Sequence, residues 1–165
     1  TTSSILWENC TPVFVDIHPE YLSIDETKIE AAITSKTTAI LATHVFGNPC
    51  HVDAIEAIAK KHNLKVIYDA AHCFGVKYKN QSVFNFGDVS TCSFHATKLF
   101  HTGEGGAIFC DDKEIFHQHV FLVPRLSLKR FVYQKIFYVF CKSHTFEDTM
   151  LRPLKYKSIS LYQVR

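Results

Sequence analysis

Apolar runs alternate with segments of helical periodicity from residue 12 to residue 69. Strands are predicted at Pro12–Ile17, Thr38–Val45 and Val66–Asp69, because each is a short run rich in apolar and β-branched residues. Helices are predicted between them, at Asp25–Ile33 and Val52–His62, where apolar residues recur every three or four positions. This order of elements predicts an α/β fold with a mostly parallel sheet flanked by helices.

The starts of both helices carry local signals. Ser23-Ile24-Asp25-Glu26 can form a capping box at the first helix, and Gly47-Asn48-Pro49 precedes the second. One face of the second helix collects its apolar residues: Val52, Ile55, Ile58 and Ala59. We therefore expect both helices to lie against the sheet.

Turn residues separate the remaining predicted elements. A polar hairpin is expected at Tyr78–Ser82, a strand at Val89–Phe94, a glycine-rich turn at Thr102–Gly106 and a strand at Ala107–Cys110. Beyond about residue 116 the apolar residues follow neither the two-residue period of a strand nor the 3.6-residue period of a helix, although Phe, Val, Leu, Tyr and Lys are abundant. No structure is predicted for that part.

Charge divides the chain at the same place. Residues 1–116 hold 9 Lys and Arg against 14 Asp and Glu, a net charge of −5, whereas residues 117–165 hold 9 against 2, a net charge of +7. We therefore expect a domain over residues 1–116 and a basic, aromatic tail over residues 117–165. The tail could contact an anionic membrane surface or nucleic acid, but an ordinary buried or poorly folded segment is the favoured interpretation.

Cysteine spacing argues against a metal site. The six cysteines are scattered singly, without a CxxC pair or a Cys/His cluster at zinc-ligand spacing. We expect reduced thiols in a cytoplasmic protein and no metal. No apolar stretch reaches the length of a membrane span. The chain begins at Thr1 without Met, so we expect it to be a piece of a longer protein.

Three groups of residues suggest chemistry. Asp69 closes an apolar strand, and the carboxyl ends of parallel strands face the ligand crevice in α/β folds. An isolated Asp at that place would more often cap a helix or a turn. Here, however, Asp69-Ala70-Ala71-His72 is followed by Ser93-Phe94-His95-Ala96-Thr97-Lys98 and then by Gly103-Glu104-Gly105-Gly106.

This ordered series resembles the DegT/DnrJ/EryC1/StrS family of sugar aminotransferases, which depend on pyridoxal phosphate (PLP). The likeness covers about residues 1–116 and includes "TPVFVDIHPEYLSID", "THVFGNP", "HNLKVIYDAAHCFG" and "SFHATKLFHTGEGGAIFCDD". It implies that the chain is part of the large PLP-binding domain of a fold-type I aminotransferase. The last motif is most similar to the branch that aminates nucleotide-linked keto-deoxysugars.

The resemblance also implies the roles of individual residues. Lys98 would form an imine with PLP and then transfer a proton at the substrate carbon. Asp69 would pair with the pyridine nitrogen and keep it protonated, and Ser93 would donate its hydroxyl to the cofactor phosphate. His72 and His95 would be further cofactor contacts, although a structural role for His95 is at least as plausible.

Two other motif residues, His44 and Glu104, are expected to be structural or to support the residues that touch the cofactor. The family's N-terminal phosphate-binding turn and C-terminal small domain are not found in this sequence. After "AIFCDDKEIF" the chain departs from the family pattern, which puts catalysis by the short chain in doubt.

The implied function is transamination of a nucleotide-linked keto-deoxysugar, with glutamate as amino donor, by a homodimer engaged in amino-sugar biosynthesis for surface polysaccharide or glycosylated metabolites. The dehydratase branch of the family is an alternative, but it replaces the imine-forming lysine that Lys98 supplies here. An inactive remnant that survives as a binding protein is a second alternative. A generic nucleotide binder is a third, although no GxGxxG follows the first strand.

Overall fold

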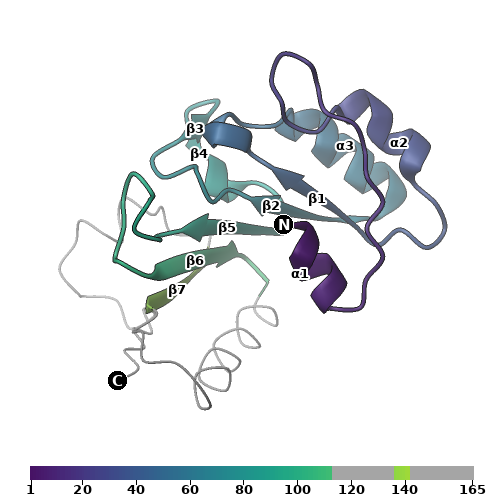
Figure 1. Cartoon of the computed structure of the whole chain (residues 1–165). Helices are drawn as coiled ribbons and strands as arrows, with labels where there is room; N and C mark the ends of the chain where they lie inside the picture. Colours follow the sequence, from purple (N-terminus) through teal and green to yellow (C-terminus); the bar gives the residue numbers. More distant parts are fainter. Residues whose placement is uncertain (113–135, 142–165) are drawn as a thin grey trace.

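A five-stranded sheet forms the frame of the molecule. The computed structural model describes residues 1–112. It also describes the backbone of residues 136–141. The strands lie in the order β1 (Ala39–Thr43), β2 (Lys65–Asp69), β5 (Val89–Ser93), β6 (Gly105–Cys110) and β7 (Ile136–Cys141) (Figure 1). Every neighbouring pair is parallel except β5 and β6. The predicted α/β fold with a mostly parallel sheet is confirmed.

Helices bury one face of this sheet. Ile40 of β1 and Val66 and Tyr68 of β2 are buried with Ile55 of α3 (Val52–His62) in a shared apolar core, which also includes Ile29 of α2 (Ile29–Ala32). Side chains alternate between the faces of a strand, so the intervening residues point the other way. The helices therefore cover the β1 and β2 part of the sheet from one side, as predicted.

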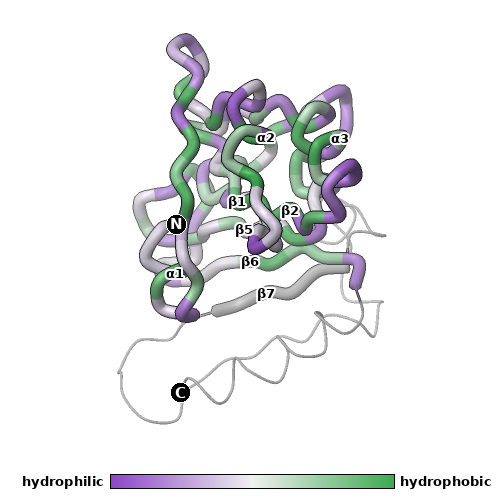
Figure 2. The backbone as a smooth tube through the Cα atoms, turned by 90° about the vertical axis from the view of Figure 1, so that its right-hand side faces the viewer, coloured by the Kyte–Doolittle hydropathy of each residue, from purple (hydrophilic) through white to green (hydrophobic). Residues whose placement is uncertain are grey.

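The opposite face is covered less completely. On this face the side chains of β1, β2 and β5 are half-buried: Leu41, Thr43, Ile67, Asp69, Thr91 and Ser93. The short helix α1 (Thr2–Trp7) lies on this side, whereas α3 lies on the other (Figures 1 and 2). Polar groups at the ends of β2 and β5 therefore face α1.

A second apolar core lies beside β5 and β6. Phe84 of η3 (Val83–Asn85) stacks on Phe109 of β6 with their ring centroids 4.3 Å apart, and both are buried with Phe94. The predicted hairpin leads into η3 as the antiparallel pair β3 (Lys77–Tyr78) and β4 (Gln81–Ser82). The segment that follows Asp69 is thus fixed to the same sheet.

Helix α3 occupies the predicted range, and its ends have physical causes. Asp53 lies in its first turn, whereas Lys60, Lys61 and His62 lie in its last turn, which suits the helix dipole. Asn63 adopts the left-handed conformation at φ 52° and donates its N–H to the carbonyls of Ala59 and Lys60. This cap stops the helix immediately before β2.

The strand predicted at Pro12–Ile17 is wrong. This segment makes one isolated antiparallel bridge, between Ile17 and Ile24, and Val13 and Phe14 are 65% and 76% exposed. A strand needs a partner for its backbone N–H and C=O groups, and apolar alternation alone does not supply one. Within the described residues β1 is the outermost strand on its side of the sheet, and residues 12–17 do not pair with it.

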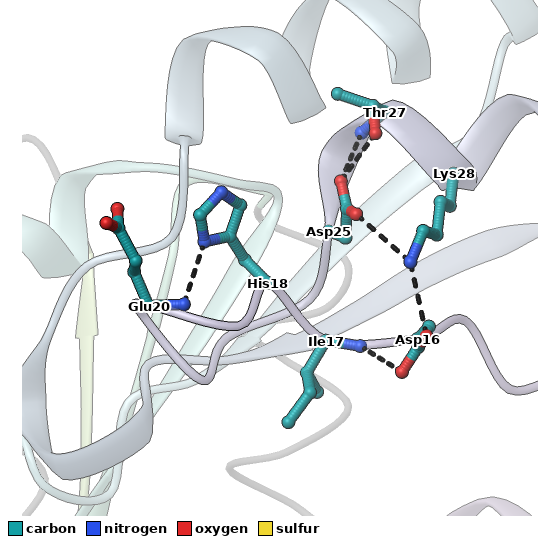
Figure 3. A network of polar contacts seen from close by, with 7 residues as sticks. All are labelled: Asp16, Ile17, His18, Glu20, Asp25, Thr27 and Lys28. Carbon is teal, nitrogen blue, oxygen red and sulfur yellow. Dashed lines mark hydrogen bonds and ion pairs between the residues drawn. The ribbon is translucent and has the colours of Figure 1, made fainter.

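The helix predicted at Asp25–Ile33 forms in two pieces, η1 (Glu26–Lys28) and α2. Asp25 rather than Ser23 provides the cap, because its Oδ1 accepts from the Thr27 N–H at 3.1 Å and the Thr27 hydroxyl at 2.6 Å. Lys28 then joins Asp25 to Asp16, with Nζ at 3.3 Å and 3.2 Å from their carboxylates (Figure 3). These contacts tie the segment before η1 to the start of α2.

The tail predicted over residues 117–165, with its expected contacts, lies outside the described residues apart from β7. Within the described part of the chain, no helix has both the length and the apolar character needed to cross a membrane.

Candidate functional site

The predicted cofactor residues gather at one edge of the sheet. Asp69 is the last residue of β2 and Ser93 the last of β5, and these parallel neighbours pair Asp69 with Thr91. Strand alternation places the Asp69 and Ser93 side chains on the same face, the one that α1 partly covers. Lys98 follows in the turn after β5, where its N–H donates to the His95 carbonyl at 2.9 Å.

Three segments distant in sequence meet at Asp69. Its Oδ1 accepts from the Ala71 N–H at 3.2 Å, and its Oδ2 accepts from the Thr1 hydroxyl at 2.6 Å. Its carbonyl accepts from the His44 N–H at 3.0 Å. The carboxylate is therefore held from both oxygens while the backbone is fixed to the end of β1. Sequence reasoning missed Thr1, because nothing local connects residues 1 and 69.

His44 supports this edge from inside the protein. Its ring is buried and stacks on Tyr68 with centroids 4.6 Å apart, and its Nδ1 accepts from the Cys50 N–H at 3.0 Å. Burial lowers the pKa of His44 to about 4, although the Asp69 charge acts in the opposite direction. The imidazole is therefore neutral at pH 7, with its proton on Nε2, and it links the loop before α3 to β1.

The turn that carries Lys98 is built around His95. Ser93 Oγ accepts from the His95 N–H at 3.3 Å, and His95 Nδ1 accepts from the Thr97 N–H at 3.3 Å. His95 Nε2 lies 3.5 Å from the carboxylate of Glu104, in the glycine-rich turn. His95 is exposed but both ring nitrogens have partners within the protein. This arrangement favours a role in shaping the turn.

Lys98 is half-buried near the end of β5. Burial raises the pKa of the neighbouring Cys92 to about 12, and the Lys98 charge opposes that rise.

The loop that contains η2 (Val45–Gly47) borders the site. Gly47, at φ 82°, would place a Cβ only 2.9 Å from the His72 carbonyl oxygen, so the loop lies directly on residue 72. The His72 side chain is exposed. Phe46 also has positive φ, at 55°, and is 80% exposed. Sequence reasoning did not single out Phe46, since an exposed aromatic ring leaves no periodic signal.

The chemistry of these groups fits PLP. The cofactor requires an amine for its aldehyde, a carboxylate for its ring nitrogen and hydrogen-bond donors for its phosphate. Asp69 and Ser93, at the ends of neighbouring strands, could supply the carboxylate and the hydroxyl, and Lys98, in the turn after β5, could supply the amine. Within residues 1–112, no cluster of His, Cys, Asp and Glu is arranged to hold a metal ion.

Comparison with known proteins identifies the family that the sequence motifs resemble. The model of the DegT/DnrJ/EryC1/StrS aminotransferase family matches residues 1–136. This match extends about twenty residues beyond the part of the chain in which the family motifs were found. A relative from Shigella dysenteriae, dTDP-4-amino-4,6-dideoxy-D-glucose transaminase, is 56% identical over 115 residues, which are 70% of this chain and 31% of the relative.

Solved structures agree with the sequence comparison. Helicobacter pylori PseC, an aminotransferase involved in the biosynthesis of pseudoaminic acid, superposes with a TM-score of 0.74 at 32% identity, over 81% of this chain and 36% of PseC. NtdA from Bacillus subtilis with bound cofactor PMP, the pyridoxamine form, has a TM-score of 0.58 at 36% identity, over 61% of this chain and 22% of NtdA. The chain spans about a third of the length of the curated relatives it matches. By its sequence and by its fold, this chain belongs to the DegT/DnrJ/EryC1/StrS aminotransferase family.

Proposed function

We propose that this chain contributes the cofactor half-site of a PLP-dependent aminotransferase that transfers an amino group to a nucleotide-linked keto-deoxysugar, with glutamate as the amino donor. The observation that carries the proposal is the convergence of Asp69, Ser93 and the Lys98 turn at one edge of the sheet. PLP, when bound, supplies the electron sink that makes amino transfer possible.

The chain's own groups have separate tasks in this proposal. Lys98 Nζ attaches the cofactor and moves a proton at the substrate carbon. The Asp69 carboxylate, held by two donors, keeps the ring nitrogen protonated. Ser93 Oγ donates to the phosphate, and it can do so while accepting from the His95 N–H because a hydroxyl both donates and accepts. His72 and His95 border the cofactor.

The substrate class rests on the relatives. The Shigella dysenteriae relative is a transaminase named for a dTDP-linked amino-dideoxy sugar, and it is the relative with 56% identity. A keto precursor of such a sugar is therefore the substrate class proposed here, for amino-sugar biosynthesis that serves surface polysaccharide or glycosylated metabolites.

We also propose a homodimer in the cytoplasm. Leu99, next to Lys98, is 91% exposed, and the proposed dimer would cover this apolar side chain. The five cysteines of residues 1–112 are free thiols, which suits a reducing compartment.

Covalent attachment of PLP tests the proposal. We expect the purified chain to develop a visible absorption band with PLP, and borohydride reduction should fix the cofactor on the Lys98 peptide, as located by mass spectrometry. Lys98→Ala should abolish both signals. Lys60→Ala, an exposed lysine on α3, is the matched control and should retain them.

A wild-type chain without the band, or with the label spread over surface lysines, would contradict the proposed cofactor site. In that case the chain would retain the fold of the family without its chemistry. Amino transfer from glutamate to a dTDP-linked keto sugar, followed by chromatography of the sugar nucleotide, then tests the substrate class.

A further inference from the structure

The Thr1 hydroxyl makes a short hydrogen bond to the candidate cofactor carboxylate. Thr1 Oγ1 lies 2.6 Å from Asp69 Oδ2, although 68 positions separate the two residues in the sequence. That distance falls in the range of charge-assisted O–H···O⁻ bonds, which are stronger than neutral ones. No motif of the sequence suggested this contact.

The local structure of Thr1 leaves its hydroxyl available for Asp69. Thr1 is the N-cap of α1, a position where a threonine side chain usually accepts from a backbone N–H of the first turn. Here its side chain makes no such bond. Instead its carbonyl accepts from the Ser4 N–H at 3.2 Å and from the Ser4 hydroxyl at 2.6 Å, which fixes the Thr1 backbone.

The two donors act on different oxygens of Asp69. The Ala71 N–H holds Oδ1 from the segment after β2, and the Thr1 hydroxyl holds Oδ2 from α1. A carboxylate turns readily about its last torsion, so a donor at each oxygen fixes its plane. A carboxylate also offers about four lone-pair sites, so room remains for a protonated ring nitrogen.

We infer that Thr1 is a positioning residue of the cofactor site, whose hydroxyl orients the Asp69 carboxylate toward the ring nitrogen of PLP. This inference rests on the proposed function. The donor comes from the residue that precedes α1, and α1 lies on the half-buried face of the sheet.

Titration of the 165-residue chain with PLP tests the inference through affinity. Thr1→Val keeps the shape of the side chain and removes the hydroxyl, and it should weaken PLP binding by about threefold to tenfold. Thr1→Ser should restore the wild-type affinity. Thr2→Val, on the adjacent residue of α1, is the matched control and should bind like the wild type.

The position of the visible band separates positioning from simple stabilisation. If Thr1 orients Asp69, the band of Thr1→Val should move toward that of Asp69→Asn, because the carboxylate tunes the electronics of the ring. An unchanged band together with unchanged affinity would overturn the role of Thr1 while leaving the proposed function intact. A wild-type chain that shows no band would instead overturn the proposed function.

A measurement without cofactor tests the contact itself. Urea unfolding of the apo chain should show that Thr1→Val lowers the midpoint in the wild type but not in an Asp69→Ala background, because the second change removes the acceptor. Equal effects of Thr1→Val in both backgrounds would overturn the inference even if PLP binds.

Discussion

Single residues decide the geometry of the candidate site. Asp69 receives hydrogen bonds from residues 1, 44 and 71, so its position depends on two other segments as well as on its own turn. Of these, residue 71 is close in sequence, whereas the other two are brought near by the fold. The carboxylate is therefore fixed only when β1, β2 and α1 are all in place.

Any side chain at position 47 in place of Gly47 should destabilise the fold. The φ of 82° at this glycine disfavours a side chain, and an added Cβ would lie 2.9 Å from the His72 carbonyl oxygen, which is backbone and cannot easily move. We predict that Gly47→Ala lowers the free energy of unfolding by about 2 kcal/mol or more. Urea unfolding followed by circular dichroism measures this loss.

Gly75 provides the matched control. It has a similar φ of 75°, but a Cβ there meets no atom within 4 Å. Gly75→Ala should therefore cost only the conformational strain, about 1 kcal/mol. If the two variants lost the same stability, the close approach of the η2 loop to residue 72 would not be energetically important.

At the scale of elements, prediction from sequence succeeded where causes are local. The amphipathic face of α3, the apolar run of β2 and the polar turn of the β3–β4 hairpin are each contained in a short window, and each formed as expected. The prediction of a helical region at Asp25–Ile33 was also correct, although the cap of this region and its division into η1 and α2 were not predicted.

Elements that depend on distant partners could not be predicted in this way. Residues 12–17 have the apolar alternation of a strand, yet no described strand pairs with them along a ladder. In the site, Asp69 was suggested by its place at the end of an apolar strand, whereas Ser93 and Lys98 were suggested by the resemblance to the family. The hydrogen bonds of Thr1 to Asp69 and of Cys50 to His44 depend on tertiary packing.

The attachment of α3 to the sheet can be tested at Ile55. This side chain is fully buried between α3 and the β1–β2 face, so Ile55→Ala leaves a cavity in the first core. We predict a loss of about 2 to 5 kcal/mol in the free energy of unfolding. Glu56→Ala, on the exposed side of the same helix, should cost about 0.5 kcal/mol or less. Comparable losses would contradict this packing.

At the scale of the whole molecule, both apolar cores contain buried thiols. Cys50 belongs to the core beneath α3, and Cys73 and Cys92 belong to the core beside β5 and β6. Burial raises the pKa of Cys50 to about 11 and those of Cys73 and Cys92 to about 12, because a thiolate loses its hydration inside the protein. In the folded chain these groups remain neutral and unreactive at pH 7.

This burial predicts a loss of stability in mild alkali. The unfolded thiols ionise near their ordinary pKa of 9.0, whereas folded Cys73 and Cys92 keep their protons until about pH 12. The unfolded state then binds fewer protons, so the free energy of unfolding falls as the pH rises above 9. Between pH 9 and pH 10 each thiol should contribute a loss of about 1 kcal/mol.

The measurement compares urea midpoints of the wild type with those of a Cys73→Ala, Cys92→Ala variant across this interval. The variant starts less stable because it loses buried volume, but it lacks the two ionisations, so the difference between the proteins should shrink as the pH rises. Cys10→Ala removes an exposed thiol, so its urea midpoint should change with pH in parallel with that of the wild type. A constant difference for the double variant would mean that Cys73 and Cys92 reach water in the folded chain, and that the second core is looser than its packing indicates.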